Sequence, residues 1–107
     1  MSGKKWPPKK ENLLDEIKKA IKENRYRQRD HALQRSKERG ITLPDAIYVL
    51  ENGYHEARKD TYNEPFNTLN YAIRGLTVDE DDVRVIVSFD EKNMLIITVM
   101  YVESKRV

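Results

Sequence analysis

The 107-residue sequence contains no cysteine, only two histidines, four glycines and no long apolar run. Without cysteine, a disulfide scaffold, a thiolate zinc site and a cysteine nucleophile are excluded. The few glycines form no phosphate-cradling loop, and the two histidines do not stand at a zinc-site spacing, so we expect no cofactor and no metal. The longest nearly apolar segment, residues 94–102, is too short to span a bilayer. We therefore expect a soluble cytoplasmic protein.

Charged residues are abundant but unevenly distributed along the chain. Residues 1–40 carry 13 Lys and Arg against 6 Asp and Glu, whereas residues 41–107 carry 7 against 12. Such a division predicts a basic face that meets nucleic acid or an acidic partner, although a well-solvated helical surface explains the same charges. Residues 1–11 are rich in lysine, so we expect a flexible basic arm ahead of a single domain over residues 12–107.

The first half of the domain has the apolar spacing of helices. Apolar residues three and four positions apart predict one helix over residues 12–24. A second helix is predicted over residues 30–39, ended by Gly40, a residue suited to a left-handed C-cap. The intervening residues 25–30 are either a short strand or a connector. A third helix is predicted from Thr42, whose side chain pairs with Asp45 in a capping box.

The second half of the domain alternates between apolar and polar residues, which is typical of strands. The clearest candidates are residues 83–89 and residues 94–102, separated by the turn 90–93. Weaker candidates are residues 54–59 and 70–75, and the acidic run 79–82 is expected to connect two strands. Helices followed by an antiparallel meander predict an α+β fold, with amino-terminal helices packed on a small antiparallel sheet.

The segment 31–41 is the most informative stretch for function. On a helix, His31, Arg35 and Arg39 recur every four residues, so they would form one row of an imidazole and two guanidiniums. Guanidinium groups match phosphate oxygens, and an imidazole can move a proton near neutral pH. A structural alternative is that His31 caps or packs at the helix start while the two arginines pair with carboxylates.

The same segment carries a resemblance to a known family. The pattern His31-Ala32-x-x-Arg35-x-x-x-Arg39-Gly40-Ile41, followed by Asp45, Val49-Leu50-x-Asn52-Gly53 and the strand 96–101, resembles the domain of unknown function 4258 family. That family is grouped with the RelE/ParE-like and MqsR-like toxins of bacterial toxin–antitoxin pairs. The resemblance implies a RelE-like fold, metal-independent cleavage of mRNA and a cognate antitoxin protein.

A toxin of this kind cleaves RNA by attack of a 2′-oxygen on the adjacent phosphorus. A base removes the 2′ proton, an acid protonates the leaving 5′-oxygen, and cations stabilise the phosphoryl charge. Under the resemblance, His31 is the expected acid or base, Tyr101 an auxiliary donor, and the phosphate clamps are Arg35, Arg39 and Arg74. The expected RNA-binding residues are Lys18, Lys22, Arg25, Arg27, Arg29, Tyr71, Arg84 and Thr98.

Three readings stay open on the sequence alone, and the last of them is a degenerate toxin fold with a purely structural or regulatory role. The first is an endoribonuclease that acts on mRNA, free or on the ribosome. The second is a non-catalytic module that binds RNA or protein through its basic helical face. In the second case binding depends on the arginines and on salt, rather than on His31.

Overall fold

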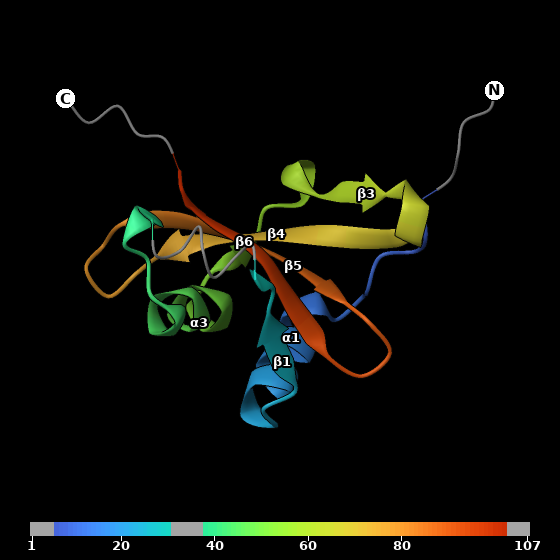
Figure 1. Cartoon of the computed structure of the whole chain (residues 1–107), viewed down its shortest axis with the longest axis horizontal. Coiled ribbons are helices and arrows are strands. Elements are labelled where there is room, and N and C mark those ends of the chain that lie inside the picture. Colours follow the sequence, from blue (N-terminus) through green and yellow to red (C-terminus); the bar gives the residue numbers. More distant parts are fainter. Residues whose placement is uncertain (1–5, 31–37, 103–107) are drawn as a thin grey trace.

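The computed structural model describes residues 6–30 and 38–102 and has an α+β architecture (Figure 1). Its helices are α1 (Leu13–Lys22) and α3 (Leu43–Asn52). Its strands are β1 (Tyr26–Gln28), β2 (Tyr54–His55), β3 (Thr61–Asn63), β4 (Thr68–Leu76), β5 (Asp82–Phe89) and β6 (Met94–Tyr101). Two short 3-10 turns, η1 (Ala57–Lys59) and η2 (Glu64–Phe66), flank β3. No helix in the described part of the chain has the length and apolarity needed to cross a bilayer.

The sheet is mixed, which corrects the expectation of a purely antiparallel one. Its strand order is β1-β6-β5-β4-β2, and β3 pairs with β4 beside this path. The β4, β5 and β6 strands form the expected antiparallel meander, but β1 pairs with β6 in parallel. The segment 25–30 therefore contains a strand, and this strand lies between the helices in the chain. Met94 N donates to Arg25 O at 2.9 Å, which sets the start of β1 beside the start of β6.

The core lies between the helices and one face of the sheet. Ile17 of α1 and Leu50 of α3 are fully buried against β-branched residues of β4, β5 and β6. Figure 1 shows both helices on the same side of β4, with β3 on the opposite side. The buried apolar residues of β5 that belong to the core are Val83, Val85 and Val87, so the alternation in the sequence correctly predicted the core face of this strand.

The opposite face of the sheet carries polar side chains on the same strands. Cross-strand partners share a face, and Arg74 of β4 is the register partner of Arg84 of β5. Tyr54 of β2 is paired with Arg74 on its other side. This polar face is where most of the charged groups of the sheet meet.

Local sequence signals place α3 and its neighbours as expected. Thr42 Oγ1 accepts from Asp45 N at 3.2 Å, and Thr42 N donates to Asp45 Oδ2 at 3.1 Å, which confirms the capping box. Gly40 has a φ of 77°, a left-handed conformation that glycine adopts without a Cβ penalty. At the other end of α3, a side chain at Gly53 would collide with the carbonyl oxygen of Arg74. This close approach holds the end of α3 against β4.

Residues 6–10 of the expected arm lie against the sheet. The Trp6 ring stacks on Tyr62 of β3 with centroids 6.2 Å apart, and Lys9 Nζ contacts Asp60 Oδ2 at 2.9 Å. Lys10 N donates to the Tyr71 hydroxyl at 3.0 Å. These contacts bring the lysine-rich segment to the β2–β4 side of the molecule.

Candidate functional site

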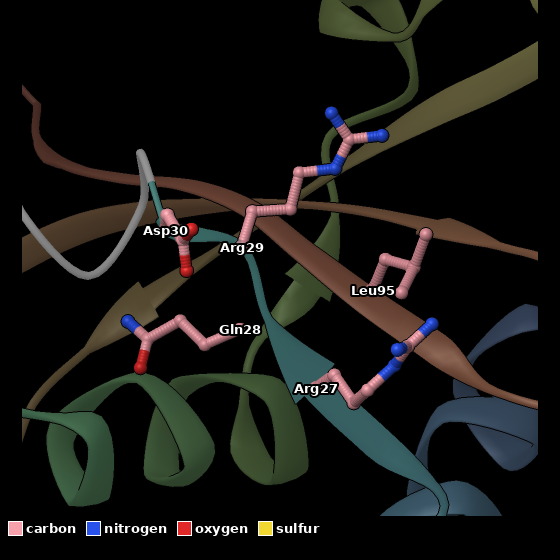
Figure 2. A pocket seen from close by; sticks show the side chains of 5 residues that line it. All are labelled: Arg27, Gln28, Arg29, Asp30 and Leu95. Atoms are coloured by element: carbon pink, nitrogen blue, oxygen red, sulfur yellow. The ribbon is translucent and has the colours of Figure 1, made fainter.

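Two arginines, one on the edge strand β1 and one directly after it, lie at a pocket of about 520 Å³. The pocket is lined by Arg27, Gln28, Arg29, Asp30 and Leu95. Figure 2 shows Arg27 and Arg29 extending to the same side of the strand as Leu95, while Gln28 extends to the other side. This arrangement follows from the alternation of side chains along a strand. We call this pocket the β1 groove.

The two arginines of the β1 groove are accessible to solvent. Arg27 has a side chain that is 66% exposed, and its nearest carboxylate oxygen, on Asp90, is 3.6 Å away. Arg29 is also exposed and forms no ion pair among the residues that the structure describes. Its backbone N–H donates to Ile96 O at 3.1 Å, so the main chain is anchored while the side chain reaches outward. An exposed guanidinium of this kind can donate two hydrogen bonds to one phosphate group.

The helix α1 and the segment before β1 carry further basic side chains. Lys18 and Lys22 are exposed and stand four residues apart, so they lie on one side of the helix. Arg25 follows at the start of β1, where Nη1 donates to Lys92 O at 2.5 Å and Nε to Glu23 Oε1 at 2.7 Å. The hydrogen bond from Arg25 lowers the pKa of Glu23. Both side chains are exposed to solvent. We call Lys18, Lys22, Arg25, Arg27 and Arg29 together the basic surface.

The structure brings Arg39 to the last strand. Its Nη1 donates to Val99 O at 2.6 Å, beyond the point where β1 stops covering the edge of β6. The same strand holds Thr98, which is partly buried, and Tyr101, whose ring is 45% exposed. Arg39 therefore lies close to the part of β6 that carries the two other candidate residues.

Two expected site residues, His31 and Arg35, lie outside the described residues, within the segment 31–37. Their neighbours on either side are described: Asp30 lines the β1 groove, and Arg39 contacts β6. The row of His31, Arg35 and Arg39 expected from helical spacing stays a prediction.

Arg74 and Arg84, expected to contact phosphate, are held instead by carboxylates. Arg74 makes two hydrogen bonds to Asp82, at 3.0 and 2.8 Å, and a third to Glu56 at 3.1 Å. Arg84 donates to both oxygens of Glu56, at 2.7 and 3.3 Å. The Glu56 side chain is only 4% exposed, whereas those of Arg74 and Arg84 are 24% and 16% exposed. We call these four residues the Glu56 cluster.

The electrostatics of the Glu56 cluster favour the charged forms of Glu56 and Arg74. The hydrogen bond from Arg84, joined by that from Arg74, holds the pKa of Glu56 below its ordinary value of 4.5 against the opposing effect of burial. The hydrogen bonds that Arg74 donates to Asp82 and to Glu56 raise the pKa of Arg74 above its ordinary value. Two guanidiniums and two carboxylates neutralise each other here, so this cluster offers no net positive charge to a phosphate.

Tyr71, expected to stack on a base, is packed inside the protein. Its side chain lies in the core with 4% of its surface exposed. The ring meets His55 and Phe89 edge-on, with centroids 5.8 and 6.2 Å away. No open ring face is available for a nucleotide in this arrangement.

The sequence analysis did not identify Glu56 or Asp82 as partners of the arginines. Asp82 was assigned to the acidic connection, but it is the first residue of β5 and stands beside Leu76 in the register. Glu56 follows the two-residue strand β2, and its N–H donates to Ala72 O at 2.8 Å. Residues 54–59 were only a weak strand candidate in the sequence, and the strand register was needed to place Glu56 beside the two arginines.

A comparison with family models gives a match over residues 29–101 to the domain of unknown function DUF4258. The matched segment is well over half of the chain. The chain belongs to the DUF4258 family. No curated protein and no solved structure matches it.

The DUF4258 segment starts just after β1 and ends with the last residue of β6. It therefore contains α3 and the β2–β6 strands, together with the Glu56 cluster. The helix α1 and strand β1 precede it, although α1 contributes Ile17 to the same core. The β1 groove lies where the two parts meet, because Arg29 and Leu95 belong to the matched segment while Arg27 does not.

Proposed function

We propose that this DUF4258 protein binds single-stranded RNA along the basic surface, with the β1 groove as the centre of the contact. The observation that supports this most directly is the pair of exposed arginines at the end of β1, Arg27 and Arg29, beside a pocket of about 520 Å³. Guanidiniums supply phosphate contacts, and the apolar side chain of Leu95 gives an unstacked base a surface to lie on. The choice of RNA among polyanions rests on the resemblance to RelE/ParE-like toxins.

A second candidate function is cleavage of the bound RNA, as in the toxin component of a toxin–antitoxin pair. Its support is the position of Arg39, which is tied to Val99 on the strand that carries Tyr101. In this proposal His31 or another base takes the 2′ proton, and Arg35 and Arg39 stabilise the phosphoryl charge. A cognate antitoxin protein would then cover the basic surface. Arg74 has no part in this version, because Asp82 and Glu56 neutralise it.

The binding proposal is tested with a fluorescently labelled single-stranded RNA titrated at several salt concentrations. The double variant Arg27→Ala/Arg29→Ala is expected to weaken binding and to reduce the slope of log affinity against log salt by about 1 to 2, since two phosphate contacts are lost. The matched control is Arg58→Ala/Lys59→Ala, which removes two positive charges from η1 on the β2 side of the sheet. Equal losses in both double variants would contradict a localised interface.

The cleavage proposal needs an experiment in cells, because a ribosome-dependent nuclease is inert on free RNA. The wild type and a His31→Ala/Arg35→Ala variant are induced in bacteria, and new transcript 5′ ends are mapped. New ends that require the wild-type residues would support an endoribonuclease. An unchanged transcript map, with both proteins folded, would leave the protein as an RNA-binding module.

A further inference from the structure

A histidine and a buried aspartate lie together at the β2 end of the molecule, away from the β1 groove. His55 is the last residue of β2, and its Nε2 lies 2.8 Å from Asp60 Oδ2. The Asp60 carboxylate is fully buried, whereas the His55 side chain is 25% exposed. An imidazole held on one side by a buried carboxylate and open on the other has the arrangement of an oriented proton acceptor.

The surroundings of Asp60 determine which nitrogen of His55 is free. Asp60 Oδ1 accepts from the backbone N–H of Ala72 at 2.9 Å, and Oδ2 also contacts Lys9 Nζ at 2.9 Å. Both oxygens of the carboxylate therefore face donors, and Oδ2 is the acceptor that His55 Nε2 meets. Neutral His55 must therefore carry its hydrogen on Nε2, which leaves Nδ1 with a lone pair. Asp60 is thus a positioning residue for the His55 ring.

His55 lines a pocket of about 320 Å³ beside the start of α1, here called the His55 pocket. The remaining lining residues are Lys10, Glu11, Asn12, Leu13, Leu14 and Asp15. Since the lining includes two carboxylates as well as Lys10, the pocket does not attract phosphate strongly by itself. A ligand with hydroxyl groups suits such a lining better than a bare anion.

The helix α1 connects the His55 pocket to the basic surface. Leu14, which lines the pocket, is followed at four-residue intervals by Lys18 and Lys22 on the same side of the helix. These ten helical residues span about 15 Å, and Arg25 continues the positive charge to β1. An RNA strand bound along this row would reach the His55 pocket at one end and the β1 groove at the other.

We infer that His55 is the base that removes the proton from an RNA 2′-hydroxyl placed in the His55 pocket. This inference rests on the proposed RNA binding. It assigns the chemical step to the His55 pocket, at the α1 end of the basic surface. The 2′ proton moves to Nδ1 as the 2′-oxygen forms a bond to phosphorus and the bond from phosphorus to the 5′-oxygen breaks. The 5′-oxygen keeps the bonding electrons and takes a proton from water, and His55 then returns its proton to the hydroxide. The products are a 2′,3′-cyclic phosphate and a free 5′-hydroxyl.

The test compares His55→Ala with His31→Ala on the same labelled RNA, both as free RNA and in a translating ribosome mixture. Loss of one general base typically lowers the rate by about 10²–10⁴-fold, so His55→Ala should lose cleavage to that extent while RNA binding changes less than about twofold. Added imidazole should restore part of the rate to His55→Ala, because the vacated space lies next to the substrate. A merely structural role for His55 would not give that rescue.

Further variants separate folding from chemistry. His55→Gln keeps a side chain that can donate to Asp60, so it should fold like the wild type and still fail to cleave. Asp60→Asn should lower cleavage without rescue by imidazole, since the base is present but misoriented. An RNA with a 2′-deoxy nucleotide at the cleaved position should bind and remain intact.

The outcomes test the role of His55 separately from the proposed RNA binding on which it rests. Binding by the wild type without any cleavage would overturn the role of His55 and leave the RNA-binding proposal in place. Cleavage that survives in His55→Ala or is abolished in His31→Ala alone would also overturn it. Absence of RNA binding by the wild type would overturn the proposed function and this inference together.

Discussion

Arginines occur in two contrasting environments in this protein, the β1 strand and the β4–β5 pair. At the end of β1, Arg27 and the following Arg29 extend from an edge of the sheet into solvent, and the carboxylate paired with Arg27 is 3.6 Å away and exposed. On β4 and β5, Arg74 and Arg84 face each other across the ladder with Glu56 between them. An arginine side chain is therefore available to a ligand at β1, whereas on β4 and β5 it is paired with carboxylates of the protein itself.

The difference shows that a count of basic residues does not locate an anion-binding surface. Glu56 comes within hydrogen-bond distance of both Arg74 and Arg84, although it lies 18 and 28 positions from them in the chain. Ion pairs of this low exposure are costly to break, because removing one partner leaves the other charge with little solvation. The exposed arginines of β1 cost the fold little, and they are therefore free to be used in binding.

The strongest test of the comparison is the substitution Glu56→Ala. It leaves two poorly exposed guanidiniums without their shared acceptor, so we expect the free energy of unfolding to fall by about 3 kcal/mol. Urea denaturation of purified protein measures this loss. The matched control Glu91→Ala removes an exposed carboxylate from the β5–β6 turn and should change stability by less than about 0.5 kcal/mol. Similar losses of unfolding free energy in both variants would show that the Glu56 cluster does not stabilise the fold more than an exposed carboxylate does.

The two kinds of arginine should also give opposite results when each is replaced. Arg84→Ala is expected to lower the free energy of unfolding by about 2 kcal/mol, because Glu56 keeps its charge with one partner fewer. RNA affinity of the folded variant should not change. Arg29→Ala should leave unfolding unchanged within about 0.5 kcal/mol and weaken RNA binding with a shallower salt dependence. Denaturation and RNA titration measure the unfolding free energy and the RNA affinity of each variant. If both variants lost stability and affinity to the same extent, the two arginine environments would not differ in function.

The smallest expected effect is the pH dependence of stability that arises from Glu56. Because the pKa of Glu56 is lowered in the folded protein, its stabilising contribution is present above its ordinary value of 4.5 and is lost as the pH falls through the folded value. Unfolding measured from neutral pH down to about pH 3 should therefore show stability decreasing on the acid side. The variant Glu56→Gln should have a lower stability at neutral pH and a shallower acid slope. Parallel curves for the two proteins would contradict this assignment.

The fold was predictable where the determinants are local. The capping box of Thr42 and Asp45 involves residues three positions apart, and the left-handed turn at Gly40 depends on one residue type. The valines of β5 show their core face by alternation alone. The parallel pairing of β1 with β6 was not predictable in this way, because it joins Tyr26 to Met94 through a register that no local pattern encodes.

The candidate site was predictable only in part for the same reason. The basic character of residues 18–29 follows from composition, and helical and strand periodicity place these side chains on the surface. The pairing of Arg74 with Asp82 and Glu56, and that of His55 with Asp60, required neighbouring strands and turns to be placed together. For Tyr71 the sequence suggested a functional role where the structure gives a packing role. This aromatic residue was expected to stack on a base, but it is part of the core.

The sequence by itself determined the α+β class, the two ends of α3, the β5–β6 hairpin and the basic amino-terminal half of the chain. These features depend on hydrogen bonds and apolar spacings within a few residues, which a single chain segment contains in full. Only the tertiary structure decided which charges are exposed and which are neutralised. That outcome depends on strand register, because Glu56 and Asp60 meet their partners only after β2 and β4 have paired.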